Sequence, residues 1–226
     1  MPKRDLSKEP EGALKLMVPD ERLLSDVGHC RNEARESLRT TSMTNPSKQV
    51  SWYESLDPNV HRYWGIREDR ENVWRAFGGL TYISWENRSA EISLIVLPGS
   101  LRQGFGTASV SLLLSEGFSK MGLAVIYGEV YGCNREGCLF WESVTKKHTT
   151  STVILPDRKL WNGQLYDSTY FSITPSYIRG PVVRQKSWVE RKKAPWEGRG
   201  RPVEDVEDVE EAKDVEDKVE DKVEDK

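Results

Sequence analysis

The 226-residue sequence lacks any long apolar run; no stretch of about 18 apolar residues, the length of a membrane-spanning helix, occurs in it. Its start, MPKRDLSKEPEGALKL, also lacks the apolar core of a secretory signal. Cysteine and histidine are scarce, with three of each. Since Cys30, Cys133 and Cys138 show no CxxC spacing, neither a disulfide framework nor a zinc site is favoured. We therefore expect a soluble, cytoplasmic protein with reduced thiols and no bound metal.

The formal net charge of −3 conceals three segments of unlike charge. Residues 203–226 carry 13 acidic and 4 basic side chains, and residues 179–202 carry 8 basic and 2 acidic ones. The acidic segment has too little apolar surface to fold, which predicts a disordered low-complexity tail. The basic segment could bind nucleic acid through charge and the rings of Trp188 and Trp196, but the acidic tail would compete, and we favour a solvated linker. The folded domain is expected within residues 1–178.

Hydrophobic periodicity and turn chemistry predict the order of elements in this domain: a strand, two helices, three strands, a helix, a strand, a helix and two final strands. The predicted strands are residues 13–18, 62–67, 76–83, 90–97, 125–131 and two within 159–173, and the predicted helices are 20–38, 48–56, 108–118 and 134–144. Asn162-Gly163 is a strong signal for a hairpin turn. This order predicts an α+β or mixed α/β layer fold.

A glycine-rich turn joins the predicted strand at residues 90–97 to the helix that follows. Its sequence is Leu101-Arg102-Gln103-Gly104-Phe105-Gly106-Thr107. Such a turn gathers unpaired backbone N–H groups and the positive end of a helix dipole, which favours an anion. The two glycines leave room for a phosphate, Arg102 adds charge and Thr107 adds a hydroxyl donor. The turn is neither a P-loop nor a good Rossmann fingerprint, and by itself it is equally compatible with a purely structural role.

The run from Ala90 to Leu114 resembles the acetyl-CoA-binding segment of the GCN5-related N-acetyltransferases. Residues 82–92, Tyr-Ile-Ser-Trp-Glu-Asn-Arg-Ser-Ala-Glu-Ile, resemble the preceding strand pair in acetyltransferases of nucleotide-linked amino sugars and of ribosomal-protein N-termini. Further pieces of this pattern follow in order over residues 13–175: Arg31-Asn32, Gln49, Trp52-Tyr53, Asn134 and Tyr166-Asp167-Ser168. The resemblance implies a mostly antiparallel sheet of six to seven strands, splayed at strands four and five and flanked by about four helices.

The same resemblance implies acetyl-CoA as the acetyl donor. Its pantetheine arm would lie in the splay between residues 90–97 and 125–131, and its pyrophosphate would lie on the amides of the glycine-rich turn. The implied cofactor-binding residues are Leu94, Ile95, Val96, Arg102, Gln103, Gly104, Phe105, Gly106, Thr107 and Asn134. Members of the family often use a glutamate on strand four as a base that acts through water, and Glu91 occupies the comparable position.

Two residues depart from the family pattern. Leu101 stands where the turn usually begins with Gln or Arg, and Trp141 stands where a tyrosine commonly protonates the departing thiolate. Because indole is not an acid at any useful pH, we expect Tyr127, Tyr131 or water to serve instead, or the thiolate to leave unassisted. Glu91, Tyr127 and Tyr131 are therefore the expected catalytic residues.

The sequence thus predicts an enzyme that moves an acetyl group from acetyl-CoA to a primary amine by direct attack in a ternary complex. A small-molecule amine, with an amino sugar favoured, is the expected acceptor and partner, and no membrane is involved. Two alternatives stay open: an acetyltransferase of a protein N-terminus, and a catalytically degenerate binding module of the same fold. The departures at Leu101 and Trp141 favour the module.

Overall fold

The computed structural model describes residues 13–178, and the predicted linker and tail lie outside them. The described strands are β1 (Leu14–Met17), β2 (Arg62–Glu68), β3 (Val73–Ser84), β4 (Ser89–Val96), β5 (Val125–Tyr131), β6 (Thr149–Trp161) and β7 (Gln164–Thr174). The α-helices are α1 (Glu21–Glu33), α2 (Lys48–Glu54), α3 (Phe105–Ser115) and α4 (Arg135–Thr145). None of these helices is both long and apolar enough to cross a membrane. The predicted element order is confirmed.

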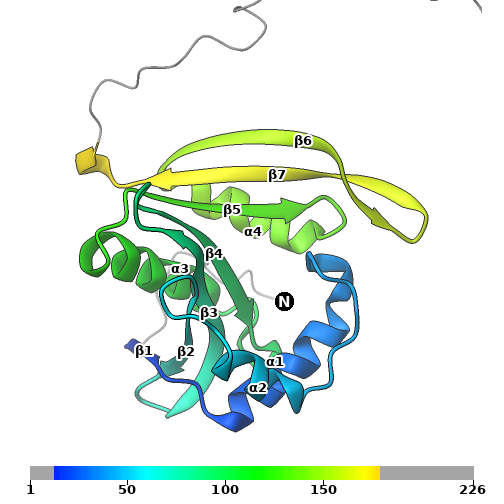
Figure 1. Cartoon of the computed structure of the whole chain (residues 1–226), viewed down its shortest axis with the longest axis vertical. Coiled ribbons are helices and arrows are strands. Elements are labelled where there is room, and N and C mark those ends of the chain that lie inside the picture. Colours follow the sequence, from blue (N-terminus) through cyan, green and yellow to red (C-terminus); the bar gives the residue numbers. More distant parts are fainter. Residues whose placement is uncertain (1–12, 179–226) are drawn as a thin grey trace, which may run out of the picture. The chain divides into compact units, whose positions relative to one another are not determined.

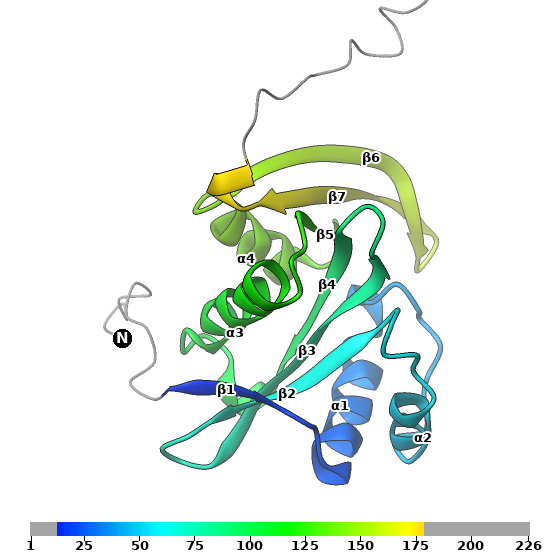
Figure 2. The same cartoon turned by 60° about the vertical axis from the view of Figure 1, so that its left-hand side comes forward.

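The seven strands form one sheet in the order β1-β2-β3-β4-β5-β7-β6. All neighbouring strands are antiparallel except β4 and β5, which are parallel. Figures 1 and 2 show α1 and α2 on one face of this sheet and α3 and α4 on the other. The sheet therefore has two buried faces, as the predicted α+β layer fold requires.

Alternation along β3 explains why both faces are apolar. Ala76 and Leu80 are fully buried against the core that α3 and α4 cover, with Leu113 of α3 among its members. Phe77, one residue along, belongs to a second core with Leu23 of α1. Successive side chains of a strand point to opposite faces, so one strand supplies both cores.

The parallel pair β4 and β5 separates soon after it begins. The two strands pair only over Ser89–Glu91 and Val125–Tyr127. Beyond this point β4 remains paired with β3, and β5 with β7, as far as Val96 and Tyr131. The backbone groups of β4 that face the gap beyond Glu91 thus have no partner in β5. The predicted splay at strands four and five is confirmed.

Several elements differ in extent from the sequence prediction, two of them most clearly. The first helix ends at Glu33 instead of residue 38, because Ala34 leaves helical geometry and a 3-10 turn, Arg35–Ser37, follows. The carbonyls of Glu36 and Leu38 then accept hydrogen bonds from Lys159 Nζ of β6. The strand β6 begins at Thr149, ten residues before the predicted pair. Its first half is rich in Thr and polar, so it resembles a loop in sequence, and the irregular pairing between Leu155 and Lys159 interrupts the strand pattern.

Candidate functional site

A cavity of about 400 Å³ lies where β4 and β5 diverge. Residues from α1, α2, the loops after them, strands β2, β3, β4, β5 and β7, and α4 line it. Glu91 of β4 and Glu129 of β5 line it from one face of the sheet, and Leu94 and Val130 line it from the other. Where two parallel strands separate, the unpaired edges of both strands are exposed to a ligand. We therefore take this cavity as the candidate binding site.

Two carboxylates converge in the cavity on one guanidinium. Arg39, in the loop after α1, donates from one terminal nitrogen to Glu91 Oε1 at 2.7 Å and to Glu129 Oε2 at 3.3 Å. The carboxylates are 17% and 9% exposed, while the Arg39 side chain is 49% exposed. Burial opposes the charge on Arg39, but hydrogen bonding to Tyr131 and the charge of Glu91 raise its pKa above its ordinary value. Arg39 therefore stays charged and joins β4 to β5 across the splay.

Glu129 is the more tightly held carboxylate of the two. Ser168 Oγ donates to its Oε1 at 2.6 Å and Tyr131 donates to its Oε2 at 3.3 Å. Arg158 of β6 lies 3.7 Å from Oε1. Glu91, in contrast, has Arg39 as its one hydrogen-bond partner among the described side chains. A carboxylate offers about four lone-pair positions, so Glu91 retains acceptor capacity for a water or an amine, and Glu129 retains little.

The loop that carries Arg39 is fixed by the hairpin on the far side of the cavity. Lys159 Nζ, buried in β6, donates to the backbone carbonyls of Glu36 and Leu38, the latter at 2.6 Å. Cys133 Sγ donates to the carbonyl of Glu36 at 3.1 Å. The ammonium group of Lys159 also lies 4.9 Å from the centre of the Tyr131 ring. These contacts order the loop, so Arg39 is held in place from outside its own segment.

The two predicted tyrosines occupy different positions. Tyr131 is buried and lines the cavity. Tyr127 is not among the residues that line it; its ring stacks on Tyr170 at 5.5 Å, and burial, followed by the charge of Glu91, raises its pKa. A phenol with a raised pKa is a poorer proton donor to a thiolate whose conjugate acid has a pKa near 8.5. Because Tyr131 lines the cavity and Tyr127 does not, its position favours Tyr131 for that role.

Trp141 lies at the cavity, in the position where the family resemblance anticipates a proton donor. It projects from α4 and packs on Phe171 of β7, with ring centres 4.7 Å apart. Gly128 of β5 gives Phe171 its space, because a Cβ atom there would meet the ring at 2.5 Å. The indole therefore serves as a fixed apolar wall of the site.

Aromatic rings and a cation form the outer part of the cavity. Trp52 of α2, Tyr63 of β2 and Tyr82 of β3 all line it. Tyr82 has a φ of 50°, which is rare for an aromatic residue, and it lies at the irregularity where β3 departs from the β4 register. The guanidinium of Arg31 lies 6.0 Å from the centre of the Trp52 ring.

The glycine-rich turn places an uncapped helix beside the splay. Gly104 is the N-cap of α3 with a φ of 87°, a conformation that favours glycine, and no side chain caps the helix. Its first N–H groups are thus left for a ligand, as the sequence analysis expects of Gln103 to Thr107. Gly106 also has a packing role, because a Cβ atom there would meet the Phe140 ring at 3.1 Å.

Side chains of this turn have local partners. Arg102 lies 3.4 Å from Glu136 of α4, and both are exposed. Gln103 Nε2 donates to the carbonyl of Gly99 at 2.7 Å. Phe105 is buried, with the Arg75 guanidinium 4.5 Å from its ring centre. For Gln103 and Phe105, it is therefore the backbone amide and not the side chain that is available to a ligand, whereas the Arg102 side chain can still turn toward an anion.

The predicted pantetheine-binding residues lie along the open edge of β4. Leu94 lines the cavity and, with Val96, packs on the core under α3 and α4, while Ile95 packs on the opposite core. Asn134 also lines the cavity, and its side-chain oxygen caps α4 by accepting from the Gly137 amide at 2.9 Å. Its amide nitrogen remains available as a donor.

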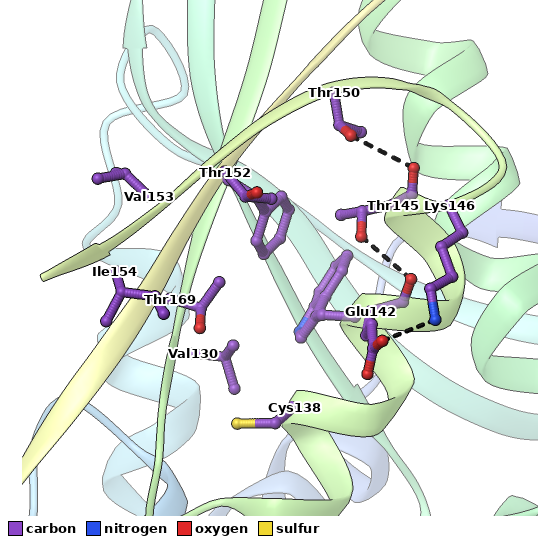
Figure 3. A pocket seen from close by; sticks show the side chains of 12 residues that line it. Val130, Cys138, Glu142, Thr145, Lys146, Thr150, Thr152, Val153, Ile154 and Thr169 are labelled. Carbon is purple, nitrogen blue, oxygen red and sulfur yellow. Dashed lines mark hydrogen bonds and ion pairs between the residues drawn. The ribbon is translucent and has the colours of Figure 1, made fainter.

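A second cavity, about 800 Å³, lies on the other face of the sheet between α4 and the β6–β7 hairpin (Figure 3). It shares Val130, Trp141 and Phe171 with the first cavity. Threonines and aliphatic side chains line most of it, and its two charged residues, Glu142 and Lys146, pair with each other at 2.6 Å. No free charge of the described residues faces this groove.

Sequence reasoning finds Glu91 but misses Glu129 and Arg39. The sequence could have indicated Glu129, since residues 127, 129 and 131 point to one face of β5. A glutamate within such a strand needs a partner when it is buried. No sequence pattern indicates Arg39, because it lies in a Ser- and Thr-rich loop. It contacts its partners, 52 and 90 residues away in sequence, only in the folded chain.

No protein-family model matches the sequence, and no curated protein matches it. Solved structures do match. Spermidine N-acetyltransferase from Vibrio cholerae, in complex with CoA and spermine, superposes with a TM-score of 0.61 at 18% identity over 71% of this chain and 95% of that chain. A chimera of the Vibrio cholerae enzyme and hSSAT gives 0.60 at 20% identity, over 73% and 96%. This likeness shows the fold and confirms the fold expected of a GCN5-related N-acetyltransferase.

Proposed function

We propose that the chain is an acetyl-CoA-dependent N-acetyltransferase that acetylates a primary amine in a ternary complex. The proposal rests on three features that lie close together. The open edge of β4, the uncapped start of α3 and a cavity with a partly free carboxylate, Glu91, lie around one splay.

The residues around the splay fit CoA. A pantetheine arm carries amide groups, and the unpaired backbone of β4 beyond Glu91 offers hydrogen bonds to them. A pyrophosphate fits the first turn of α3, where the N–H groups of Gln103 to Thr107 and the helix dipole both favour an anion. Arg102, 81% exposed, adds charge at the edge of this site. When bound, acetyl-CoA supplies a thioester that an uncharged amine can attack.

Glu91 is the proposed base. It accepts the proton of the acceptor ammonium, directly or through one water, because it keeps acceptor capacity beside Arg39. Glu129 is a positioning residue that holds Arg39 and Tyr131 in place. Tyr131 is the proposed proton donor to the departing thiolate. The backbone amide of Val96 is proposed to stabilise the oxyanion, because the Leu97 amide bonds to Arg75 of β3 and successive amides of a strand alternate in direction.

The acceptor proposed here is an amino sugar. Trp52, Tyr63 and Tyr82 give the cavity flat apolar faces of the kind that pack on sugar rings. The Vibrio cholerae neighbour binds spermine in its structure. A polyamine carries several positive charges, and Arg31, which has no carboxylate partner among residues 13–178, would repel a charge beside it. Arg31 therefore argues for an acceptor other than a polyamine.

Acetyl transfer tests this function directly. The full chain is incubated with acetyl-CoA and a panel of amines that includes amino sugars, spermidine and a peptide with a free N-terminus. Released CoA thiol and the gain of one acetyl group on the acceptor are measured together. Transfer to an amine, lost in Glu91→Gln, is expected. A chain that binds acetyl-CoA but transfers to no amine would favour the degenerate binding module.

That module is the second candidate, and Trp141 is the observation that favours it. The Trp141 side chain lies at the splay, where the family usually has a tyrosine as proton donor, and an indole cannot act as an acid. If Tyr131 does not act from the opposite strand, the site retains CoA binding and loses an efficient route for the thiolate proton. The transfer experiment above separates the two candidates.

A further inference from the structure

Arg31 is a charged group of the cavity that the proposed chemistry does not use. It lies in the last turn of α1, half-buried, and lines the same cavity as Glu91 and Glu129. Within residues 13–178 it makes no ion pair with a carboxylate, in contrast to Arg39 and Arg75. A half-buried guanidinium with no carboxylate partner keeps N–H groups available for an anion from a ligand.

Trp52 fixes the position of this guanidinium. The Arg31 carbon Cζ lies 6.0 Å from the centre of the Trp52 ring, close enough for a cation–π contact. The ring is itself held by Tyr63, with centres 5.3 Å apart in an edge-to-face arrangement. A guanidinium packed on a ring keeps its N–H edge in a defined direction, which suits two-point recognition of a carboxylate or phosphate.

The charged side chains of the cavity can bind a ligand that carries one positive and one negative group. Glu91, at the splay, suits the amine, and Arg31, which lies against Trp52 of α2, suits a negative charge. Arg39 cannot take the second role in the same way, since Glu91 and Glu129 already engage it. Arg31 is thus the cation of this cavity that is free to meet an anion from a ligand.

Resting on the proposed acetyltransferase function, we propose that the acceptor is an amine that also carries a phosphate or carboxylate, and that Arg31 binds this anionic group. Arg31 is then a specificity-determining residue that acts on acceptor binding. Its loss changes the KM for the acceptor and leaves kcat nearly unchanged, because Arg31 takes no part in the proposed proton transfers.

The test uses the full chain and three acceptors that share one amino-sugar ring: glucosamine, glucosamine 6-phosphate and 2-amino-2-deoxyglucuronate. The first carries no anion, the second a phosphate and the third a carboxylate. Kinetics with acetyl-CoA, and direct binding of each compound by titration calorimetry, are measured for the wild type, Arg31→Gln and Arg31→Lys. Arg62→Gln is the matched control, since Arg62 also packs on a tryptophan, Trp85, at 5.3 Å but does not line the cavity.

The wild type is expected to favour one or both anionic compounds over glucosamine. The Arg31→Gln change should raise the KM for the favoured compound about 10- to 100-fold, the loss expected for charged hydrogen bonds, with kcat within about threefold. The Arg31→Lys variant should recover part of the affinity, and Arg62→Gln should behave as wild type. Whether phosphate or carboxylate gives the larger effect identifies the anion.

Two results would overturn the proposal, and they differ. The acceptor inference fails, and the acetyltransferase function stands, if the chain acetylates glucosamine as efficiently as it acetylates both anionic compounds. The same conclusion follows if Arg31→Gln leaves the KM of the anionic compounds unchanged. If acetyl-CoA itself does not bind, the proposed function fails and the acceptor inference fails with it. Circular dichroism of Arg31→Gln separates loss of the ligand contact from loss of the fold.

Discussion

The two cavities on either side of Trp141 share three residues and differ in almost every other respect. The groove between α4 and the β6–β7 hairpin has twice the volume of the cavity at the splay, about 800 Å³ against about 400 Å³. In the groove, the charges of Glu142 and Lys146 neutralise each other. In the splay cavity, residues from five or more segments of the chain bring two carboxylates and two guanidinium groups together. Convergence of charge, rather than volume, is the reason why we propose the splay cavity as the site of chemistry.

Replacing a carboxylate in each cavity gives the largest expected difference. Glu91→Gln keeps the shape of the side chain and removes the proposed base, so kcat for acetyl transfer should fall about 100-fold or more. Glu142→Gln, the matched change in the larger groove, should leave kcat unchanged. Steady-state kinetics of the two variants would check this. Equal losses of kcat in both variants would contradict the proposal that the chemistry takes place in the splay cavity and not in the larger groove.

Removal of the guanidinium that joins β4 to β5 should lower stability. Arg39→Gln leaves the largely buried Glu129 with fewer partners and places it near Glu91 without the shared cation. We expect the free energy of unfolding to fall by about 1 to 2 kcal/mol. Urea unfolding measures this, with Arg102→Gln as the control, whose exposed pair with Glu136 should contribute less than about 0.5 kcal/mol. An equal effect in the two variants would mean that the cross-link does not stabilise the splay.

The two tyrosines give the smallest expected contrast. Tyr131→Phe removes a phenol that lines the cavity and holds Glu129, and it should reduce kcat about three- to tenfold. Tyr127→Phe changes a ring stacked on Tyr170 outside the lining, and it should change kcat less than twofold. Parallel kinetics of both variants, at one pH, measure this difference. A larger loss in Tyr127→Phe would reverse the assignment of the proton donor.

Much of the fold follows from local sequence. Alternation along residues 125–131 and the Asn162-Gly163 turn, with φ values of 48° and 75°, are properties of neighbouring residues and are confirmed. The end of α1 is missed because no proline or glycine near residue 33 marks the change to the 3-10 turn at Arg35–Ser37. Lys159, more than 100 residues away, then holds the carbonyls of Glu36 and Leu38. The early start of β6 is missed because its Thr-rich half has no apolar alternation.

The candidate site divides in the same way. The glycine-rich turn and Glu91 stand in contiguous sequence, and the resemblance to a known family indicates both. The roles of Arg39, Glu129 and Lys159 arise from contacts between segments, so no window of sequence reports them. Phe105 and Gly106 show the converse, since each lies in the predicted motif and also has a packing partner, Arg75 and Phe140 respectively.

The most direct test of the account is to map CoA onto the chain by amide chemical shifts in a titration of the isotope-labelled protein. The account predicts that the amides of Gln103 to Thr107 and those of β4 beyond Glu91 shift most, while Thr152 and Ile154 in the larger groove do not move. Shifts centred on the groove, or none at millimolar CoA, would contradict the claim that the splay of β4 and β5 is the binding site.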